Sequence, residues 1–274
     1  MKTESEDFQI YLHGEKLVGD DYCEEELKAW YRDEAAAYSG LVCGRAEQYT
    51  YEYHALNFVN GYRYLETVDL QVCLGYGAAT GAEFLPIANR IHSLIIIDPG
   101  EFQSETSLFN VPVRHVKPQT SGIIPLENNY CDIVTCFGAL HHVANVSFVI
   151  KEMARILKPS GKLLIREPIS NMGDWRIARA GLTPRERGIP VKLMNEAICD
   201  AGLEVNHMAF CDFSPLRALV KRLGMSHPYN FNTFAHLDRI LSGMFGWNVR
   251  YHRPSFFDKF APGSGFWICS KGVL

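Results

Sequence analysis

Residues 72–81 of the chain read VCLGYGAATG, an apolar run that passes into three glycines at positions 75, 77 and 81. A buried strand that ends in glycines and opens into a helix lets backbone N–H groups approach a ligand closely. Several classes of adenosine-containing ligand bind at turns of this kind. The turn therefore predicts a ligand site at the end of a strand, and the rest of the sequence has to decide which ligand it holds.

Strands and helices are expected to alternate on both sides of this turn. Apolar runs predict seven strands, at 68–74, 93–98, 111–116, 131–137, 162–166, 203–211 and 265–272. Helical periodicity predicts helices at 22–38, 45–66, 81–90, 146–157 and 190–201. We expect Pro86 to shorten the third of these helices and Asn145 to cap the fourth. Strands that alternate with helices indicate a doubly wound, mostly parallel α/β sheet.

The composition is that of an ordinary globular protein. The chain has 274 residues, of which 47% are apolar and 21% charged, and no apolar run approaches the ~20 residues of a membrane span. Residues 171–274 contain 13 basic side chains against 8 acidic ones, but the bases are dispersed. The eight cysteines include no CxxC pair, and the N-terminal residues lack the apolar segment of a secretory signal. We therefore expect a cytoplasmic protein with no nucleic-acid partner and no disulfide framework.

Four stretches of the sequence carry a family resemblance. They are LGYGAATG at 74–81, IIIDPG at 95–100, IPLENNYCDIVTCFGALHHV at 124–143 and VIKEMARILKPSGKLLIREP at 149–168. Together they resemble class I S-adenosylmethionine-dependent methyltransferases, particularly the branch that acts on small molecules. The third and fourth stretches are the specific ones, because dinucleotide-binding folds share a glycine turn. The resemblance implies a Rossmann-like methyltransferase fold with S-adenosyl-L-methionine as cofactor.

The resemblance implies cofactor contacts at the ends of the first two strands. The turn residues Gly75, Tyr76 and Gly77 are expected to meet the amino-acid part of the cofactor, because a glycine has no side chain to collide with it. Asp98 ends the second strand, where a carboxylate accepts hydrogen bonds from both ribose hydroxyls, with Pro99 beside it. The alternative for Asp98 is a carboxylate that only stabilises the turn before Pro99.

Further cofactor contacts are implied after the next two strands. The resemblance places Thr120 and Ser121 against the adenine amine, although a loop hydroxyl can also be merely solvated. It places Phe137, Gly138 and Ala139 along the methionine portion, with ordinary packing as the alternative.

Two adjacent histidines, His141 and His142, follow the fourth long strand close to the expected position of the methyl group. Methyl transfer is an in-line displacement, so a base is needed only when the acceptor must lose a proton. An imidazole accepts a hydroxyl proton near neutral pH, and one of the pair is the candidate base, with His141 ahead of His142. The alternative is that the pair only shapes the loop. No metal is expected, because adjacent side chains point in different directions.

The chain departs from the family pattern at Cys73, where the family usually has an acid two residues before the first glycine. That acid helps to hold the cofactor's amino group. Its absence implies weaker binding, a carboxylate supplied from elsewhere, or a cofactor-binding scaffold or partner subunit that has lost catalysis. An NAD-dependent oxidoreductase is a further alternative, but the chain lacks the tight G-x-G-x-x-G spacing.

Four segments are expected along the chain. Residues 1–64 form a helical lid, 65–212 the cofactor-binding core, 213–262 a helical insertion that covers the substrate, and 263–274 the strand that completes the sheet. Arginines and aromatic residues are interspersed through 213–262. Arginine forks suit carboxylates and phosphates, so the sequence predicts a small polar or anionic acceptor, such as a sugar, a lipid-linked compound or a natural product. It leaves a homodimer open.

Overall fold

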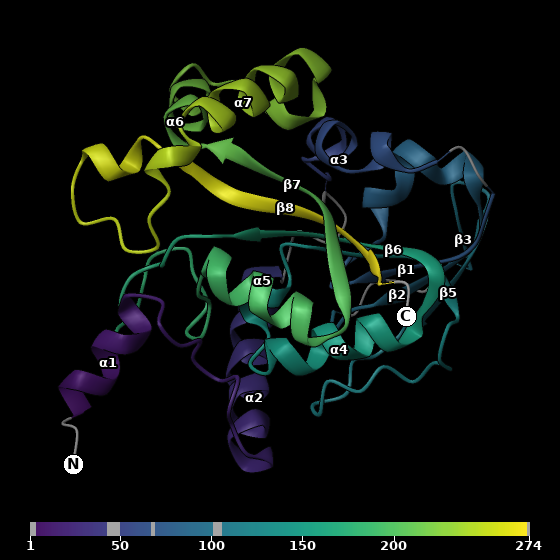
Figure 1. The fold of residues 1–274 in the computed structure, drawn as a ribbon, viewed down its shortest axis with the longest axis horizontal. Coiled ribbons are helices and arrows are strands. Elements are labelled where there is room, and N and C mark those ends of the chain that lie inside the picture. Colours follow the sequence, from purple (N-terminus) through teal and green to yellow (C-terminus); the bar gives the residue numbers. More distant parts are fainter. Residues whose placement is uncertain (1–3, 43–49, 67–68, 101–105, 273–274) are drawn as a thin grey trace.

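One eight-stranded sheet forms the centre of the protein (Figure 1). The structure is a computed structural model, and it describes residues 4–42, 50–66, 69–100 and 106–272. The strand order is β3-β4-β2-β1-β5-β6-β8-β7. The strands are β1 (Leu70–Tyr76), β2 (Ile91–Ile97), β3 (Ser107–Leu108), β4 (Val111–Val116), β5 (Cys131–Phe137), β6 (Leu157–Pro168), β7 (Leu203–Phe213) and β8 (Pro262–Lys271). β4, β2, β1, β5 and β6 pair in parallel, and β8 runs antiparallel between β6 and β7. This is the predicted doubly wound, mostly parallel sheet.

All seven predicted strands are present. The eighth is the two-residue β3, which is too short for its sequence to show the alternation of apolar and polar residues that marks a strand. α4 ends at Ile156, close to the predicted end of the helix, but β6 begins at Leu157 rather than at residue 162, so the predicted start of this strand was wrong. Leu157 pairs with Cys131, and the register then shifts before Lys162 pairs with Ile133. The residues between them therefore bulge from the ladder, and the chain passes from helix to strand without a separate loop.

Seven α-helices lie in the described part of the chain. They are α1 (Glu4–Leu12), α2 (Glu24–Val42), α3 (His54–Asn60), α4 (Val146–Ile156), α5 (Val191–Asp200), α6 (Ser214–Arg222) and α7 (Asn232–Met244). The predicted helix at 45–66 is shorter: α3 and the 3₁₀ turn η2 (Tyr62–Tyr64) occupy its second half, and residues 45–49 lie outside the described ranges. The predicted helix at 81–90 is the 3₁₀ helix η3 (Ala82–Arg90), in which Pro86 has no N–H to donate.

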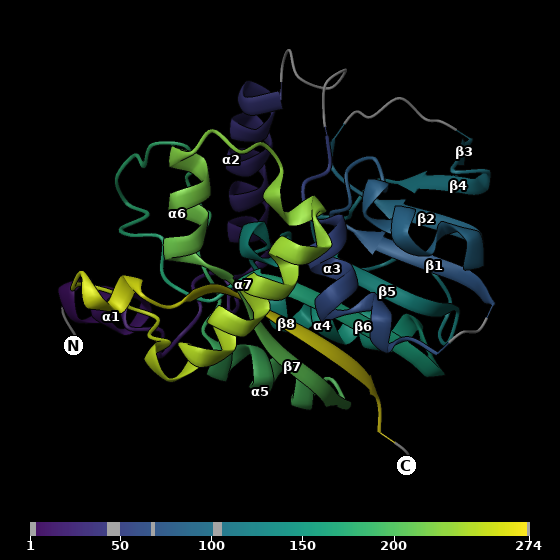
Figure 2. The same ribbon diagram turned by 90° about the horizontal axis from the view of Figure 1, so that it is seen from above.

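The helices cover both faces of the sheet. α4 and α5 pack on one face around Leu163, Ile165 and Met153, whereas α3, η3 and α7 pack on the other around Leu164, Phe84 and Phe266. Figure 2 shows α3, α6 and α7 gathered on one side of the strands. Burial of these apolar side chains is the main stabilising contribution. None of the described helices is both long and apolar enough to cross a bilayer.

The N-terminus of α4 is capped from a distant part of the sequence. Asn145 precedes the helix as predicted, but its side chain donates to the carbonyl of Ser121 and makes no capping bond. Asp20 accepts instead from the N–H and the hydroxyl of Ser147, at 2.8 and 2.6 Å. The segment between α1 and α2 is therefore fixed against the core by a helix cap.

Candidate functional site

The glycine turn after β1 lies at the carboxyl edge of the sheet, against the turn after β5. A Cβ on Gly75 would meet the Cβ of Ala78 at 2.6 Å, and a Cβ on Gly77, whose φ is +65°, would meet the Cβ of Ala139 at 2.3 Å. From the sequence, these glycines are expected to allow the approach of a cofactor. The atoms that exclude a side chain are protein atoms, so the glycines first allow the two turns to pack together.

Replacing Gly77 by alanine is expected to lower the free energy of unfolding by about 2–4 kcal/mol, because the new methyl group overlaps Ala139 and φ is positive. Gly181→Ala is the matched control: its φ is +77°, but no atom lies within 4 Å of the new Cβ, so only the backbone cost remains. Urea unfolding of both variants checks this prediction. Equal losses would show that contact with Ala139 is not the reason for Gly77.

Asp98 follows β2 and faces the glycine turn. Its Oδ2 accepts from the N–H of Ala79 and its Oδ1 from the N–H of Gly100, both at 2.8 Å, and the residue is 8% exposed. Burial raises the pKa of Asp98, although these two N–H groups oppose the shift. Each oxygen of a carboxylate has a second lone pair, so Asp98 can still accept from two hydroxyls of a ribose. The residue thus fits the sugar of an adenosyl cofactor.

The other residues predicted after β2 and β4 are more exposed. Pro99 is exposed, and its carbonyl accepts from Lys117 Nζ at 2.9 Å. Thr120 is exposed, and the hydroxyl of the half-buried Ser121 accepts from the N–H of Ile123 at 3.3 Å. That bond closes a local turn and leaves the second lone pair of the hydroxyl free. Contact of Thr120 or Ser121 with adenine stays a prediction.

The predicted residues at the ends of β1 and β5 lie in or beside the core. Tyr76 and Phe137 are buried, and the ring of Phe137 lies 5.4 Å from that of Phe266. Ala139 contacts the glycine turn as described, and Gly138, with φ +71°, is half-buried between the ends of β5 and β6. The ring of Phe137 thus packs in the core and Gly138 presents bare backbone, and contact of Phe137, Gly138 or Ala139 with the cofactor stays a prediction.

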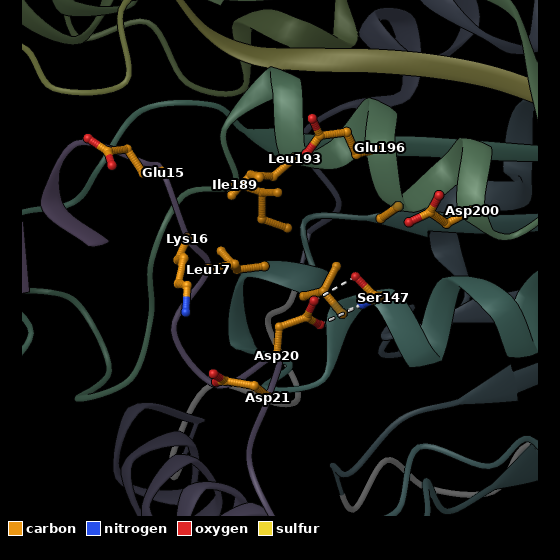
Figure 3. A pocket seen from close by; sticks show the side chains of 12 residues that line it. Glu15, Lys16, Leu17, Asp20, Asp21, Ser147, Ile189, Leu193, Glu196 and Asp200 are labelled. Atoms are coloured by element: carbon orange, nitrogen blue, oxygen red, sulfur yellow. Dashed lines mark hydrogen bonds between the residues drawn. The ribbon is translucent and has the colours of Figure 1, made fainter. Parts of the chain in front are cut away.

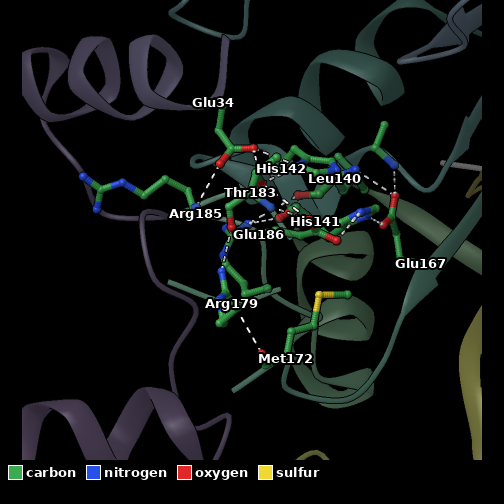
Figure 4. Close-up of polar contacts among 12 residues, drawn as sticks. Glu34, Leu140, His141, His142, Glu167, Met172, Arg179, Thr183, Arg185 and Glu186 are labelled. Atoms are coloured by element: carbon green, nitrogen blue, oxygen red, sulfur yellow. Dashed lines mark hydrogen bonds and ion pairs between the residues drawn. The ribbon is translucent and has the colours of Figure 1, made fainter. Parts of the chain in front are cut away.

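His141 is anchored by a buried carboxylate from β6 (Figure 4). Glu167, which is 0% exposed, accepts from the N–H groups of Ala139 and Leu140 through Oε1, at 2.8 and 2.7 Å. Its Oε2 lies 2.7 Å from Nδ1 of His141. A carboxylate accepts, so Nδ1 carries a hydrogen, and Nε2 lies 3.6 Å from Oε1 of Glu186. The pair therefore fixes the orientation of the imidazole.

His142 joins the same loop to α2. Its Nδ1 lies 2.8 Å from Oε2 of Glu34, which also accepts from the hydroxyl of Thr183 at 2.8 Å. Burial alone would raise the pKa of Glu34, but the hydrogen bonds from His142 and Thr183 bring it below its usual value. Trp30 donates from its ring to the carbonyl of His142 at 2.8 Å. These bonds therefore hold α2 against the turn after β5, and Figure 4 shows Glu34 of α2 beside His142.

One group among the described residues has the spacing that a metal ion needs. A ligand atom from each of His141, His142 and Glu186 lies within 4.8 Å of the others, and His141 Nε2 is 3.6 Å from Glu186 Oε1. Two imidazoles and a carboxylate would suit a divalent transition ion. The expectation that no metal binds stays a prediction, which metal analysis of the purified protein would check.

The position of the missing family acid is apolar. Cys73 is fully buried, and burial raises its pKa well above the ordinary value, so the thiol carries no charge. A different carboxylate lies beneath the turn: Glu83 of η3 accepts from the hydroxyl of Thr135, which itself contacts the carbonyl of Leu74. Burial raises the pKa of Glu83 to about 7, against the opposing effects of Thr135 and of Arg166.

Replacing Glu83 by glutamine is expected to stabilise the protein at pH 8 by about 1–3 kcal/mol. The folded protein holds the Glu83 proton up to about pH 7, against 4.5 ordinarily. Stability of the wild type therefore falls as the pH rises through this window, and glutamine removes that fall. Urea unfolding at pH 5 and pH 8 measures the difference, with the exposed Glu204→Gln as control. An effect of equal size at both pH values would contradict the assignment.

A buried arginine beside Gly138 was not identified from the sequence. Arg166, next to Glu167 in β6, is 8% exposed and points to the opposite face of the sheet, where Nη1 donates to Oδ1 of Asn57 at 2.8 Å. Its guanidinium carbon lies 4.1 Å from the centre of the Tyr53 ring. The signal in the sequence was a pair of charged residues that directly follows the apolar run at 163–165.

A separate groove lies beside the start of α4, between α5 and the segment that joins α1 to α2. It has a volume of about 330 Å³, and Asp20, Asp21, Glu196 and Asp200 are among its lining residues (Figure 3). The carboxylate of Asp20 already accepts the capping hydrogen bond from the N–H of Ser147 in α4. The groove does not include the glycine turn, Asp98 or His141, so it is not the candidate site.

Comparisons with known proteins agree with this geometry. A family model described as a methyltransferase domain matches residues 72–165. No curated protein matches the chain by sequence.

Solved structures share the fold at low sequence identity. A chain of the complex between the Haloferax volcanii Trm112 methyltransferase activator and its methyltransferase is 14% identical with a TM-score of 0.57, over 89% of this chain and 98% of that one. An S-adenosylmethionine-dependent methyltransferase from Listeria monocytogenes is 13% identical with a TM-score of 0.55, over 80% and 99%. The Haemonchus contortus phosphoethanolamine N-methyltransferase 2, solved with phosphomonomethylethanolamine and S-adenosylhomocysteine, is 16% identical with a TM-score of 0.50, over 79% and 52%.

Proposed function

We propose that this chain, a class I S-adenosylmethionine-dependent methyltransferase, transfers the methyl group to an oxygen or nitrogen of a small polar or anionic acceptor. The observation that carries the proposal is the His141–Glu167 pair beside Gly138. It sets an oriented proton acceptor next to bare backbone, at the sheet edge where the glycine turn and Asp98 meet. Such a group is needed when the acceptor is a hydroxyl or a protonated amine.

The donor is held by the residues at the carboxyl edge. S-adenosyl-L-methionine carries its methyl group on a sulfonium sulfur. When the methyl group passes to the acceptor, the rest of the cofactor leaves as a neutral thioether. Asp98 would accept from the ribose hydroxyls, with Pro99 beside it, and Thr120 or Ser121 would bound the adenine. Backbone of the β1 turn (Gly75, Tyr76, Gly77) and of the β5 turn (Phe137, Gly138, Ala139) would bound the methionine portion.

Within this arrangement His141 is the proton acceptor. Glu167 fixes the ring through Nδ1, so Nε2 would take the proton that the acceptor loses as the new bond to carbon forms. The carboxylate of Glu167 stabilises the resulting imidazolium, and it can do so because it is fully buried. His142, bonded to Glu34, would instead hold α2 over the site and exclude water.

We further propose, for the four segments of the chain, the roles that the sequence predicted. The segment 1–64 covers the site through α2, and the segment 213–262, with α6 and α7, covers the acceptor on the opposite face of the sheet. Tyr229 in this insertion stacks on Tyr53 with ring centres 5.7 Å apart, which supports that role. The core 65–212 and the strand at 263–274 form the sheet itself.

The test is a pair of binding and turnover measurements. Calorimetric titration is expected to show binding of S-adenosylhomocysteine and none of NAD, and release of S-adenosylhomocysteine from the methyl donor is then followed across candidate acceptors. Cys73 gives a reason to consider a second function, a cofactor-binding scaffold, because the chain lacks the usual acid. The scaffold would be favoured if the protein binds S-adenosylhomocysteine but turns over no acceptor, and if the His141→Gln variant shows the same binding and the same lack of turnover.

A further inference from the structure

Arg166 is a buried cation without a charged partner. In the part of the chain that the structure describes, no carboxylate forms an ion pair with it, and its guanidinium donates to the neutral side chain of Asn57. Guanidinium stays protonated at every ordinary pH, so this charge cannot be avoided by losing a proton. Burying an uncompensated charge is costly, and proteins retain such charges where a ligand supplies the opposite charge.

The surroundings hold this side chain rigidly. Asn57 is 0% exposed and is itself held by a donor bond to the hydroxyl of Tyr51, at 2.6 Å. The ring of Tyr53 covers one face of the guanidinium at 4.1 Å, and Phe137 lies 5.6 Å away. A guanidinium positioned by stacking has lost its rotational freedom before a ligand arrives, which favours binding.

Carboxylates on the elements around Arg166 have other partners. Asp212 accepts from Arg217 and from the hydroxyl of Tyr229, and Asp238 accepts from the N–H groups of Asp212 and Phe213. Glu83 is bonded to Thr135 on the neighbouring strand, and its raised pKa, about 7, reduces its charge near neutral pH. None of them neutralises the guanidinium directly.

The free edge of the guanidinium borders the same space as His141. A Cβ built on Gly138 would lie 3.9 Å from Nη2 of Arg166 and 3.7 Å from Cε1 of His141, and apart from the chain neighbours no other atom would lie within 4 Å of it. Nη2 and Nε have no hydrogen-bond acceptor among the described residues, and neither is a fully enclosed atom. A molecule over Gly138 would therefore touch the arginine on one side and the imidazole on the other.

We infer that Arg166 binds an anionic group of the methyl acceptor, a carboxylate or phosphate, while His141 faces the atom that is methylated. This inference rests on the proposed function and narrows its substrate to small hydroxy or amino acids and phosphate esters. An oxyanion accepts two parallel bonds from the fork of an arginine, which fixes the distance between the anionic group and the methylated atom. Acceptors of the same shape without the negative charge are rejected.

The test uses the full chain loaded with S-adenosylhomocysteine. Thermal shift and calorimetry compare hydroxy acids with their amides, such as lactate with lactamide and p-hydroxybenzoate with p-hydroxybenzamide, together with inorganic phosphate. We expect at least one anion to bind about tenfold or more tightly than its neutral partner. This preference is expected to be lost in Arg166→Gln, partly kept in Arg166→Lys, and unchanged in Arg222→Gln, which removes an exposed arginine of α6.

Three outcomes would overturn the inference. The first is that neither phosphate nor any acid binds the wild type more tightly than the amides do. The second is that the preference survives in Arg166→Gln. The third is that Arg166→Gln weakens S-adenosylhomocysteine but not 5′-methylthioadenosine, which lacks the amino-acid portion, because Arg166 would then bind the carboxylate of the cofactor. Loss of S-adenosylhomocysteine binding in the wild type itself would instead contradict the proposed function, so the two failures are distinguishable.

Discussion

Replacing Glu167 by glutamine is expected to lower turnover by about two to four orders of magnitude, with affinity for S-adenosylhomocysteine within a few-fold of wild type. The amide oxygen can still accept from the N–H groups of Ala139 and Leu140, so the loop keeps its position. The amide nitrogen, however, faces Nδ1 of His141 and donates to it. The ring then carries its hydrogen on Nε2, where it can no longer accept a proton from the substrate.

Single-turnover and steady-state rates with an accepted substrate measure this effect. His141→Gln is expected to show a similar loss, and the double variant should lose little more, because the two residues act as one unit. His92→Gln, an exposed histidine at the start of β2, is the control for removal of an imidazole. If Glu167→Gln keeps the wild-type rate while His142→Gln loses it, the proton acceptor is His142 and our assignment is wrong.

The second large effect is expected at Asp98. Asp98→Ala should weaken S-adenosylhomocysteine binding by about a hundredfold or more, because two charge-assisted hydrogen bonds to the ribose are lost, each contributing about 1.5–3 kcal/mol. The same change removes the acceptor of the N–H groups of Ala79 and Gly100, so the turn itself is disturbed. A measurement that separates these two causes is needed.

An analogue of S-adenosylhomocysteine without the ribose 2′-hydroxyl separates them. The wild type should bind the analogue about tenfold more weakly than the parent, whereas Asp98→Ala should not distinguish the two. Asp200→Asn, at an exposed position in α5, is the control for loss of a carboxylate. Full discrimination by the Asp98 variant would mean that the carboxylate stabilises only the turn.

The fold was predictable because its signals are local. The strand at 131–137 and the strand at 111–116 agree with the structure to the residue, since each is a short run bounded by polar or turn residues. Errors arose where local preference and tertiary pairing disagree. The polar residues at 158–161 favoured a strand that begins at 162, yet the pairing of Leu157 with Cys131 extends β6 through them. A single proline turned the segment after the glycines into a 3₁₀ helix.

The site was predictable only where a motif marks it. Asp98 faces the glycine turn, as expected from its place after β2, and the histidine loop lies at the predicted edge. The partners that give these residues their chemistry are distant in sequence. Glu34 meets His142 across 108 positions, and Arg166 meets Asn57 across 109. A sequence offers many acids and amides at such separations, and only the packed structure selects one of them.

The position of Arg166 and Glu167 has a consequence for how activity is distributed along the chain. The match to the methyltransferase-domain model ends at residue 165, within β6 and one residue before them. The residues that we propose for the donor lie within the matched stretch, whereas Asn57 lies upstream of it and Arg166 and Glu167 lie downstream. If the proposals for Arg166 and His141 hold, exchanging Asn57 and Arg166 while Glu167 is kept should change which acceptor is used and leave donor binding intact. A graft of the matched stretch alone should carry over the donor site without the arginine that selects the acceptor.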